Sequence, residues 1–171
     1  MTVRIERLGP GDGERWRSIR LHALEDAPHA FGTTYAEAVQ WDIAGWEAQL
    51  IEFATFVAVV DDRDVGVVRG AAHESIHLRE LLSMWVAPTA RRQGIGAQLI
   101  DNVAAWAEST GATALVLDVV AANTSAIALY ERAGFRRFDG EAMGDRAPNE
   151  IRFVRTLLPS VRRRHMGDQD G

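Results

Sequence analysis

Hydrophobic and polar positions follow two different periods along the chain. Apolar side chains form unbroken or alternating runs in some segments, as in β-strands, and recur every third or fourth position in others, as in amphipathic helices. Strands are predicted over residues 3–8, 53–60, 65–73, 80–87, 114–120, 135–140 and 150–158. Helices are predicted over residues 14–27, around 41–50, from 94 to 111 and over 124–133. Because strands and helices alternate in the second half, the pattern indicates an α/β or α+β fold with mixed strand pairing.

Turn-forming residues separate these segments. Proline disfavours helical backbone at the residue before it, so Pro28 is expected to end the first helix. The acidic stretch from Asp61 to Asp64 lies between two apolar runs, which predicts a β-hairpin. Gly111 and Gly134 follow the last apolar positions of two helices and are placed to end them.

The composition fits one globular domain. With 171 residues, 47% of them hydrophobic, the chain is long enough for one substantial core and short for two. We expect a single domain over residues 1–158 and a flexible tail over 159–171, which carries three arginines from Arg162 to Arg164. The formal net charge of -5, with no longer basic stretch, argues against a nucleic-acid partner.

Two further features of the sequence narrow its location and chemistry. No apolar run approaches the length of a membrane span and the first residues lack the apolar core of a signal peptide, so we expect a cytoplasmic protein without a membrane partner. The sequence contains no cysteine, which excludes disulfides, thiolate metal ligands and a cysteinyl covalent intermediate.

The segment "RRQGIGAQL" from Arg91 to Leu99 lies between a predicted strand and a predicted helix. A helix N-terminus carries unpaired amides and partial positive charge, and therefore binds phosphate well. Gly94 and Gly96 would let a diphosphate approach the backbone, while Arg91 and Arg92 would add positive charge. A Walker loop is excluded because no Gly-Lys-Ser/Thr ending follows, and a dinucleotide fingerprint would need a third glycine. The alternative interpretation is that the glycines ease a tight turn and the arginines are solvated.

Two longer stretches, "LLSMWVAPTARRQGIGAQLI" and "LVLDVVAANTSAIALYERAGF", together resemble the GCN5-related N-acetyltransferase (GNAT) superfamily over Glu80 to Phe135. The resemblance implies a mixed, largely antiparallel twisted sheet, splayed at its centre, with helices on both faces. It also implies transfer of an acetyl group from acetyl-CoA to a primary amine, directly and in a ternary complex. No metal is expected, and a bacterial enzyme acting as a monomer or homodimer is expected.

The resemblance assigns the coenzyme A site to three parts of the chain. The family pattern Arg/Gln-x-x-Gly-x-Gly/Ala binds the coenzyme A diphosphate through backbone amides, and a bulge holds the preceding strand apart from its neighbour so that its backbone can bind the pantetheine arm. An asparagine after the next strand and a tyrosine in the following helix complete the pattern. The implied cofactor-binding residues are Met84, Trp85, Val86, Arg91, Arg92, Gln93, Gly94, Ile95, Gly96, Asn123 and Tyr130.

Asn123 and Tyr130 lie seven positions apart, close to two helical turns, so both can face one cleft if a helix begins near Asn123. By resemblance, the Tyr130 phenol protonates the departing coenzyme A thiolate and acts as the general acid. Each residue also has a purely structural interpretation. Asn123 suits the N-cap of a helix, and Tyr130 suits a half-buried core aromatic.

The general base and the acceptor are less well marked. Ammonium groups have pKa values of about 10, so an amine must lose a proton before it attacks. We rank Glu80, at the start of the splayed strand, as the first candidate base and Glu150, at the start of the last strand, as a second; either carboxylate could simply be solvated. By resemblance, the first helices and their loop form a wall of the acceptor site, to which we assign Phe31, Tyr35 and Glu150.

Two questions stay open on the sequence alone. A polyamine, an aminoglycoside, a peptide terminus and a lysine side chain are all compatible acceptors. The fold could also serve a non-catalytic acyl-CoA sensor or interaction module, although the presence of both Asn123 and Tyr130 favours an enzyme.

Overall fold

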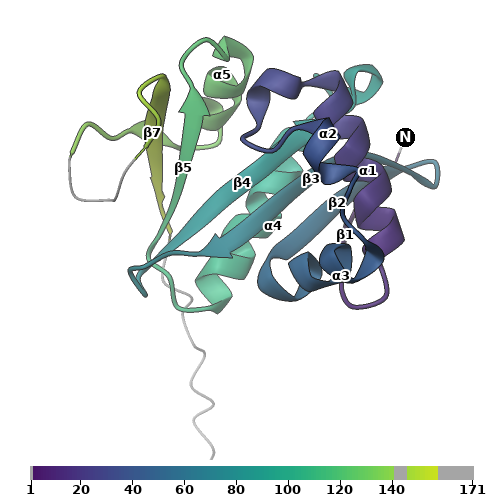
Figure 1. Ribbon diagram of the computed structural model, residues 1–171. Coiled ribbons are helices and arrows are strands. Elements are labelled where there is room, and N and C mark those ends of the chain that lie inside the picture. Colours follow the sequence, from purple (N-terminus) through teal and green to yellow (C-terminus); the bar gives the residue numbers. More distant parts are fainter. Residues whose placement is uncertain (1, 141–145, 158–171) are drawn as a thin grey trace, which may run out of the picture.

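The computed structural model, which describes residues 2–140 and 146–157, contains one seven-stranded sheet with the strand order β1-β2-β3-β4-β5-β7-β6 (Figure 1). All neighbouring strands are antiparallel except β4 and β5, which are parallel. The strands are β1 (Val3–Arg7), β2 (Ala54–Val60), β3 (Arg63–Ala72), β4 (Leu78–Val86), β5 (Ala114–Val120), β6 (Arg136–Arg137) and β7 (Glu150–Thr156). The predicted mixed, largely antiparallel sheet is therefore confirmed.

Helices cover both faces of the sheet, as expected (Figure 1). On one face α1, α2 and α3 enclose a core built around Trp16 and Trp46, and on the other face α4 and α5 enclose a larger core. The helices are α1 (Gly13–Asp26), α2 (Tyr35–Ala38), α3 (Ile43–Glu52), α4 (Ile95–Ser109) and α5 (Thr124–Arg132), with short 3-10 turns η1 (Pro28–Ala30) and η2 (Pro88–Ala90). Gly111 and Gly134 have φ values of +83° and +87°, consistent with their predicted role in ending α4 and α5.

The sheet opens between its two central strands. Only Leu78, Arg79 and Glu80 of β4 pair with β5 in the described sheet. On the other edge of β4 the register slips by one residue, because Val67 of β3 faces Trp85 whereas Arg69 faces Leu82. The extra residue forms a β-bulge, which bends a strand and increases its twist. Beyond Glu80 the two strands consequently diverge, and the predicted splay at the centre of the sheet is confirmed.

Two expected elements differ from the structure. The single helix predicted around residues 41–50 is accompanied by a separate short helix, α2, because Thr34 and Asp42 each cap a helix through a side-chain oxygen. The strand predicted over 135–140 is confined to the two residues of β6. The predicted tail over 159–171 lies outside the described residues.

Candidate active site

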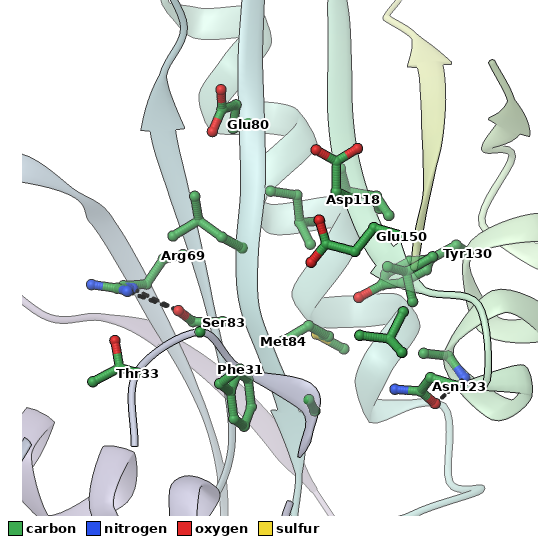
Figure 2. A pocket seen from close by; sticks show the side chains of 18 of the residues that line it. Phe31, Thr33, Arg69, Glu80, Ser83, Met84, Asp118, Asn123, Tyr130 and Glu150 are labelled. Carbon is green, nitrogen blue, oxygen red and sulfur yellow. Dashed lines mark hydrogen bonds between the residues drawn. The ribbon is translucent and has the colours of Figure 1, made fainter. Parts of the chain in front are cut away.

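A cavity of about 340 Å³ lies where β4 and β5 diverge (Figure 2). Its walls come from β4, β5, α5 with its N-cap, the start of β7, and η1 with the loop that follows it, with single side chains from α1 and β3. The sheet itself therefore creates the cavity, because β4 and β5 pair only as far as Glu80. Of the predicted site residues, the structure brings together Phe31, Glu80, Met84, Asn123, Tyr130 and Glu150 in its lining.

Tyr130 is held by α5 with its ring in the core and its hydroxyl directed into the cavity (Figure 2). The residue is only 6% exposed, and its ring packs edge-on against Phe135 at a centroid distance of 5.8 Å. Burial raises the pKa of the Tyr130 phenol well above its usual range, since the charged phenolate is poorly solvated there. The hydroxyl consequently keeps its proton at neutral pH and can donate a hydrogen bond within the cavity.

Asn123 forms the N-cap of α5, as its structural interpretation predicts. Its side-chain oxygen accepts a hydrogen bond from the Ala126 amide at 3.2 Å. The same residue lines the cavity, so capping and a place in the site are compatible. One helix thus positions both Asn123 and Tyr130.

The bulged end of β4 directs successive side chains to different environments. Met84 lines the cavity, whereas Trp85 is buried on the opposite face and donates its indole N–H to Asp26 at 2.9 Å. The Val86 carbonyl accepts a hydrogen bond from the Arg91 side chain at 2.8 Å. Trp85 could therefore contribute to a cofactor site only through its backbone, along the edge of β4 that does not pair with β5.

The segment from Arg91 to Gly96 forms the entry to α4. Gly94 adopts a left-handed conformation, with φ of +78°, and no described side chain caps the helix. A Cβ atom at Gly94 would meet no atom of the described residues within 4 Å, so the backbone there is open to an approaching group. Free amides and open space at a helix N-terminus are what an anionic phosphate requires.

The other residues of this segment have different surroundings. The Arg91 guanidinium forms an ion pair with Asp26, so part of its charge is already balanced. Arg92 is exposed, and Gln93 donates to the Thr89 carbonyl at 3.2 Å. Ile95 is buried in the core beneath them.

Gly96 has a packing reason for lacking a side chain. A Cβ atom there would lie 2.9 Å from Leu129 and 3.1 Å from Met84. The glycine therefore lets α4 approach α5 and β4 closely, next to the cavity.

Three carboxylates line the cavity. Glu80 and Glu150 were singled out in the sequence, and Asp118 on β5 was not. Asp118 binds Arg152 through two hydrogen bonds of 2.8 Å and 2.7 Å, so its charge is paired. Glu80 lies 3.9 Å from the Nε2 atom of His73.

The acceptor side differs from the expectation at one position and adds two residues. Phe31 lines the cavity, but Tyr35 lies on α2, is 42% exposed and is not part of the lining. Arg20 of α1 and Arg69 of β3 line it and were missed. The signal for Arg20 was present, because it follows Trp16 by four positions and thus places a charge on the apolar face of a helix.

Two kinds of feature are absent from the described ranges, 2–140 and 146–157. No group of three or more His, Asp or Glu side chains there could hold a metal ion. None of the helices in those ranges combines the length and apolar character needed to cross a membrane.

Comparison with known proteins gives a consistent picture. Residues 16–135 match the model of the "Acetyltransferase (GNAT) family". A mycothiol acetyltransferase of Salinispora tropica is 31% identical over 150 residues, which cover 81% of this chain and 45% of that protein. An N-acetylaspartate synthetase of Homo sapiens is 40% identical over 81 residues, which cover 47% of this chain and 27% of that protein. The chain spans less than half the length of these curated relatives.

Solved structures share the fold. A GNAT-family acetyltransferase from Streptococcus pneumoniae superimposes with a TM-score of 0.73 at 18% identity, covering 92% of this chain and 100% of that one. The PaiA N-acetyltransferase from Thermoplasma acidophilum, crystallised in complex with coenzyme A, gives a TM-score of 0.72 at 15% identity with the same coverage.

Proposed function

Since the chain belongs to the acetyltransferase (GNAT) family, we propose that it transfers an acetyl group from acetyl-CoA to a primary amine, directly and in a ternary complex. The observation that carries the proposal is the cavity at the splayed centre of the sheet, into which the protonated Tyr130 hydroxyl points. A thioester already holds an activated acyl group, so the protein has to align an amine with it and manage two protons.

The described residues fit coenzyme A. The open backbone at Gly94 and the uncapped N-terminus of α4 would hold the diphosphate, with Arg92 close by in sequence and exposed. The edge of β4 beyond Glu80 has no partner strand in the described sheet, so its backbone groups near Met84 are available to the pantetheine arm. Both features lie along β4 and the turn that follows it, which makes one continuous path from the helix to the cavity.

The two proton transfers fall to two different residues of the cavity lining. Tyr130 would donate to the leaving thiolate, a role supported by the direction of its hydroxyl into the cavity. Glu80 would accept the proton of the amine, directly or through water, and Glu150 is the second candidate. Asp118 suits this role less well because Arg152 already pairs with it.

The acceptor does not follow from the relatives. The names of the matching proteins, mycothiol acetyltransferase and N-acetylaspartate synthetase, point to different acceptors, and each alignment covers less than half of the relative. We further propose a cytoplasmic bacterial enzyme that acts as a monomer or homodimer, which rests on the resemblance alone.

The test is turnover with a panel of amino acids, polyamines, aminoglycosides and peptides. Each amine is mixed with acetyl-CoA and the protein, and release of the free coenzyme A thiol is followed. Release that depends on one class of amine supports the proposal. Binding of acetyl-CoA without thiol release for any class would instead indicate a non-catalytic acyl-CoA sensor.

A further inference from the structure

Two arginines line the cavity on the side of α1 and β3, opposite Tyr130. Arg20 is only 4% exposed, and its guanidinium lies 4.3 Å above the Phe31 ring. Its Nη1 atom is buried without a hydrogen-bond partner among the described residues. An N–H group in this situation is costly, because it has lost water without gaining another acceptor.

Arg69 is fixed next to the bulge of β4. Its guanidinium donates to the Ser83 hydroxyl at 3.0 Å and 2.8 Å (Figure 2). It also donates to the Gln49 side-chain oxygen at 3.1 Å. It also stacks over the rings of Phe53 at 4.4 Å and Trp16 at 5.0 Å. All of these partners are neutral, so they orient the guanidinium without balancing its charge.

Within residues 2–140 and 146–157, neither arginine forms an ion pair. Burial lowers the pKa of Arg20 to about 10. Burial and the charge of Arg20 also lower the pKa of Arg69, to about 9, and outweigh the opposite effect of the Glu52 charge. Both side chains are therefore still cationic at neutral pH. Buried charges are normally paired, as Arg152 is with Asp118 in the same region. Glu52 acts on Arg69 without forming an ion pair with it, so the Arg20–Arg69 end of the cavity lacks a directly bound anion among the described residues.

The opposite end of the cavity has the reverse polarity. Asp118 and Glu150 lie with Tyr130 on one side of β4, whereas Arg69 lies with Ser83 and Thr33 on the other, and Glu80 lies farther along β4 (Figure 2). An amine would be attracted to the carboxylates, and an anionic group to the arginines. The cavity, at about 340 Å³, has the size of a small-molecule site.

We propose that the acceptor is a small amine that also carries an anionic oxyacid group, carboxylate or phosphate, and that this group binds to Arg20 and Arg69. The inference rests on the proposed acetyl transfer and narrows its substrate class. The simplest such acceptors are amino acids. Polycationic acceptors such as polyamines and aminoglycosides are disfavoured, since two unbalanced guanidinium groups would repel them.

The first test uses the unmodified protein and matched acceptors. Glycine, β-alanine, 4-aminobutanoate and a set of α-amino acids are each compared with their carboxamides, and 2-aminoethylphosphonate is compared with ethanolamine. We expect kcat/KM to be at least about 10-fold higher for the anionic member of the preferred pair. This ratio corresponds to the free energy that a hydrogen bond to a charged group contributes. The preferred pair distinguishes a carboxylate from a phosphate acceptor.

Failures of the two proposals are distinguishable. If carboxamides or polyamines are acetylated as well as the anionic amines, acetyl transfer stands and the anion site is overturned. If no anionic amine is acetylated, the anion site is also overturned, and a melting shift with acetyl-CoA alone then shows whether cofactor binding survives.

The second test asks whether the two arginines bind the anionic group of the acceptor. Arg20→Gln and Arg69→Gln should each raise KM for the anionic acceptor by about 10- to 100-fold and remove the preference over its carboxamide. The acetyl-CoA melting shift should not change, and Arg69→Lys should restore part of the preference. Arg7→Gln, an exposed position on β1, is the matched control and should leave both constants unchanged. Well-folded variants that keep the full preference would overturn the assignment.

Discussion

At the scale of single residues, Tyr130 has both of the properties that its two interpretations require. Its ring packs against Phe135 in the core, and its hydroxyl faces the cavity. Removing only the hydroxyl separates these roles, because the packing of the ring stays while the proton donor is lost.

Tyr130→Phe should therefore melt close to the unmodified protein and keep its affinity for acetyl-CoA. Turnover should fall by about 10²- to 10⁴-fold, the usual contribution of a positioned proton donor, and the loss should appear in kcat more than in KM. Steady-state kinetics and thermal melting measure the two effects. Unchanged kcat with an unchanged pH profile would show that another group protonates the thiolate.

Asn123 allows a similar separation. Asn123→Ala should lower the free energy of unfolding by about 0.5–2 kcal/mol, because the Ala126 amide loses its cap. Asn123→Asp keeps a capping oxygen and should retain stability. If the aspartate variant is stable but binds acetyl-CoA more weakly in a calorimetric titration, Asn123 contacts the cofactor; equal affinity would leave capping as its role.

At the scale of elements, the hydrophobic pattern predicted most strands and helices but not what makes the cavity. Apolar periodicity identified β4, β5 and α5, because each is an uninterrupted segment that carries apolar side chains on one buried face or on both faces. The bulge in β4 was expected only by resemblance to a family. Ser83 has a φ of +57°, and no glycine marks that position in the sequence. The roles of Arg20 and Arg69 depend on the tertiary arrangement that brings α1, β3 and β4 together. Local sequence patterns do not encode this arrangement.

The packing of α4 on the sheet gives a test at this scale. A Cβ atom at Gly70 of β3 would lie 2.3 Å from the Trp106 ring of α4, which is rigid. Gly70→Ala should lower the free energy of unfolding by about 1–3 kcal/mol through overpacking. In a Trp106→Leu background, Gly70→Ala should lower the free energy of unfolding by less than it does when Trp106 is present. A double-mutant cycle in denaturant measures this difference. Additive effects would contradict this packing.

At the scale of the whole molecule, the two halves of the sheet contribute different functions. The half that contains β1 to β3, with α1 and its following loop, supplies the cationic wall of the cavity. The half that contains β5 and β7, with α5, supplies the proton donor and the carboxylates of Asp118 and Glu150, whereas Glu80 comes from β4. Bulged β4 and the entry to α4 lie between them, where we place acetyl-CoA. A ligand bound there contacts only the folded chain, so it should stabilise the whole domain.

The most direct test of the account is the melting temperature with and without acetyl-CoA. At about 100 times its dissociation constant, acetyl-CoA should stabilise the fold by roughly 2.7 kcal/mol, which gives a clear upward shift. Gly94→Asp should abolish the shift, because it places negative charge where the diphosphate must lie, whereas Gly94→Asn, which has a similar shape and also tolerates the left-handed backbone, should keep part of it. No shift in the unmodified protein at millimolar acetyl-CoA, or equal shifts in both variants, would contradict the proposed site.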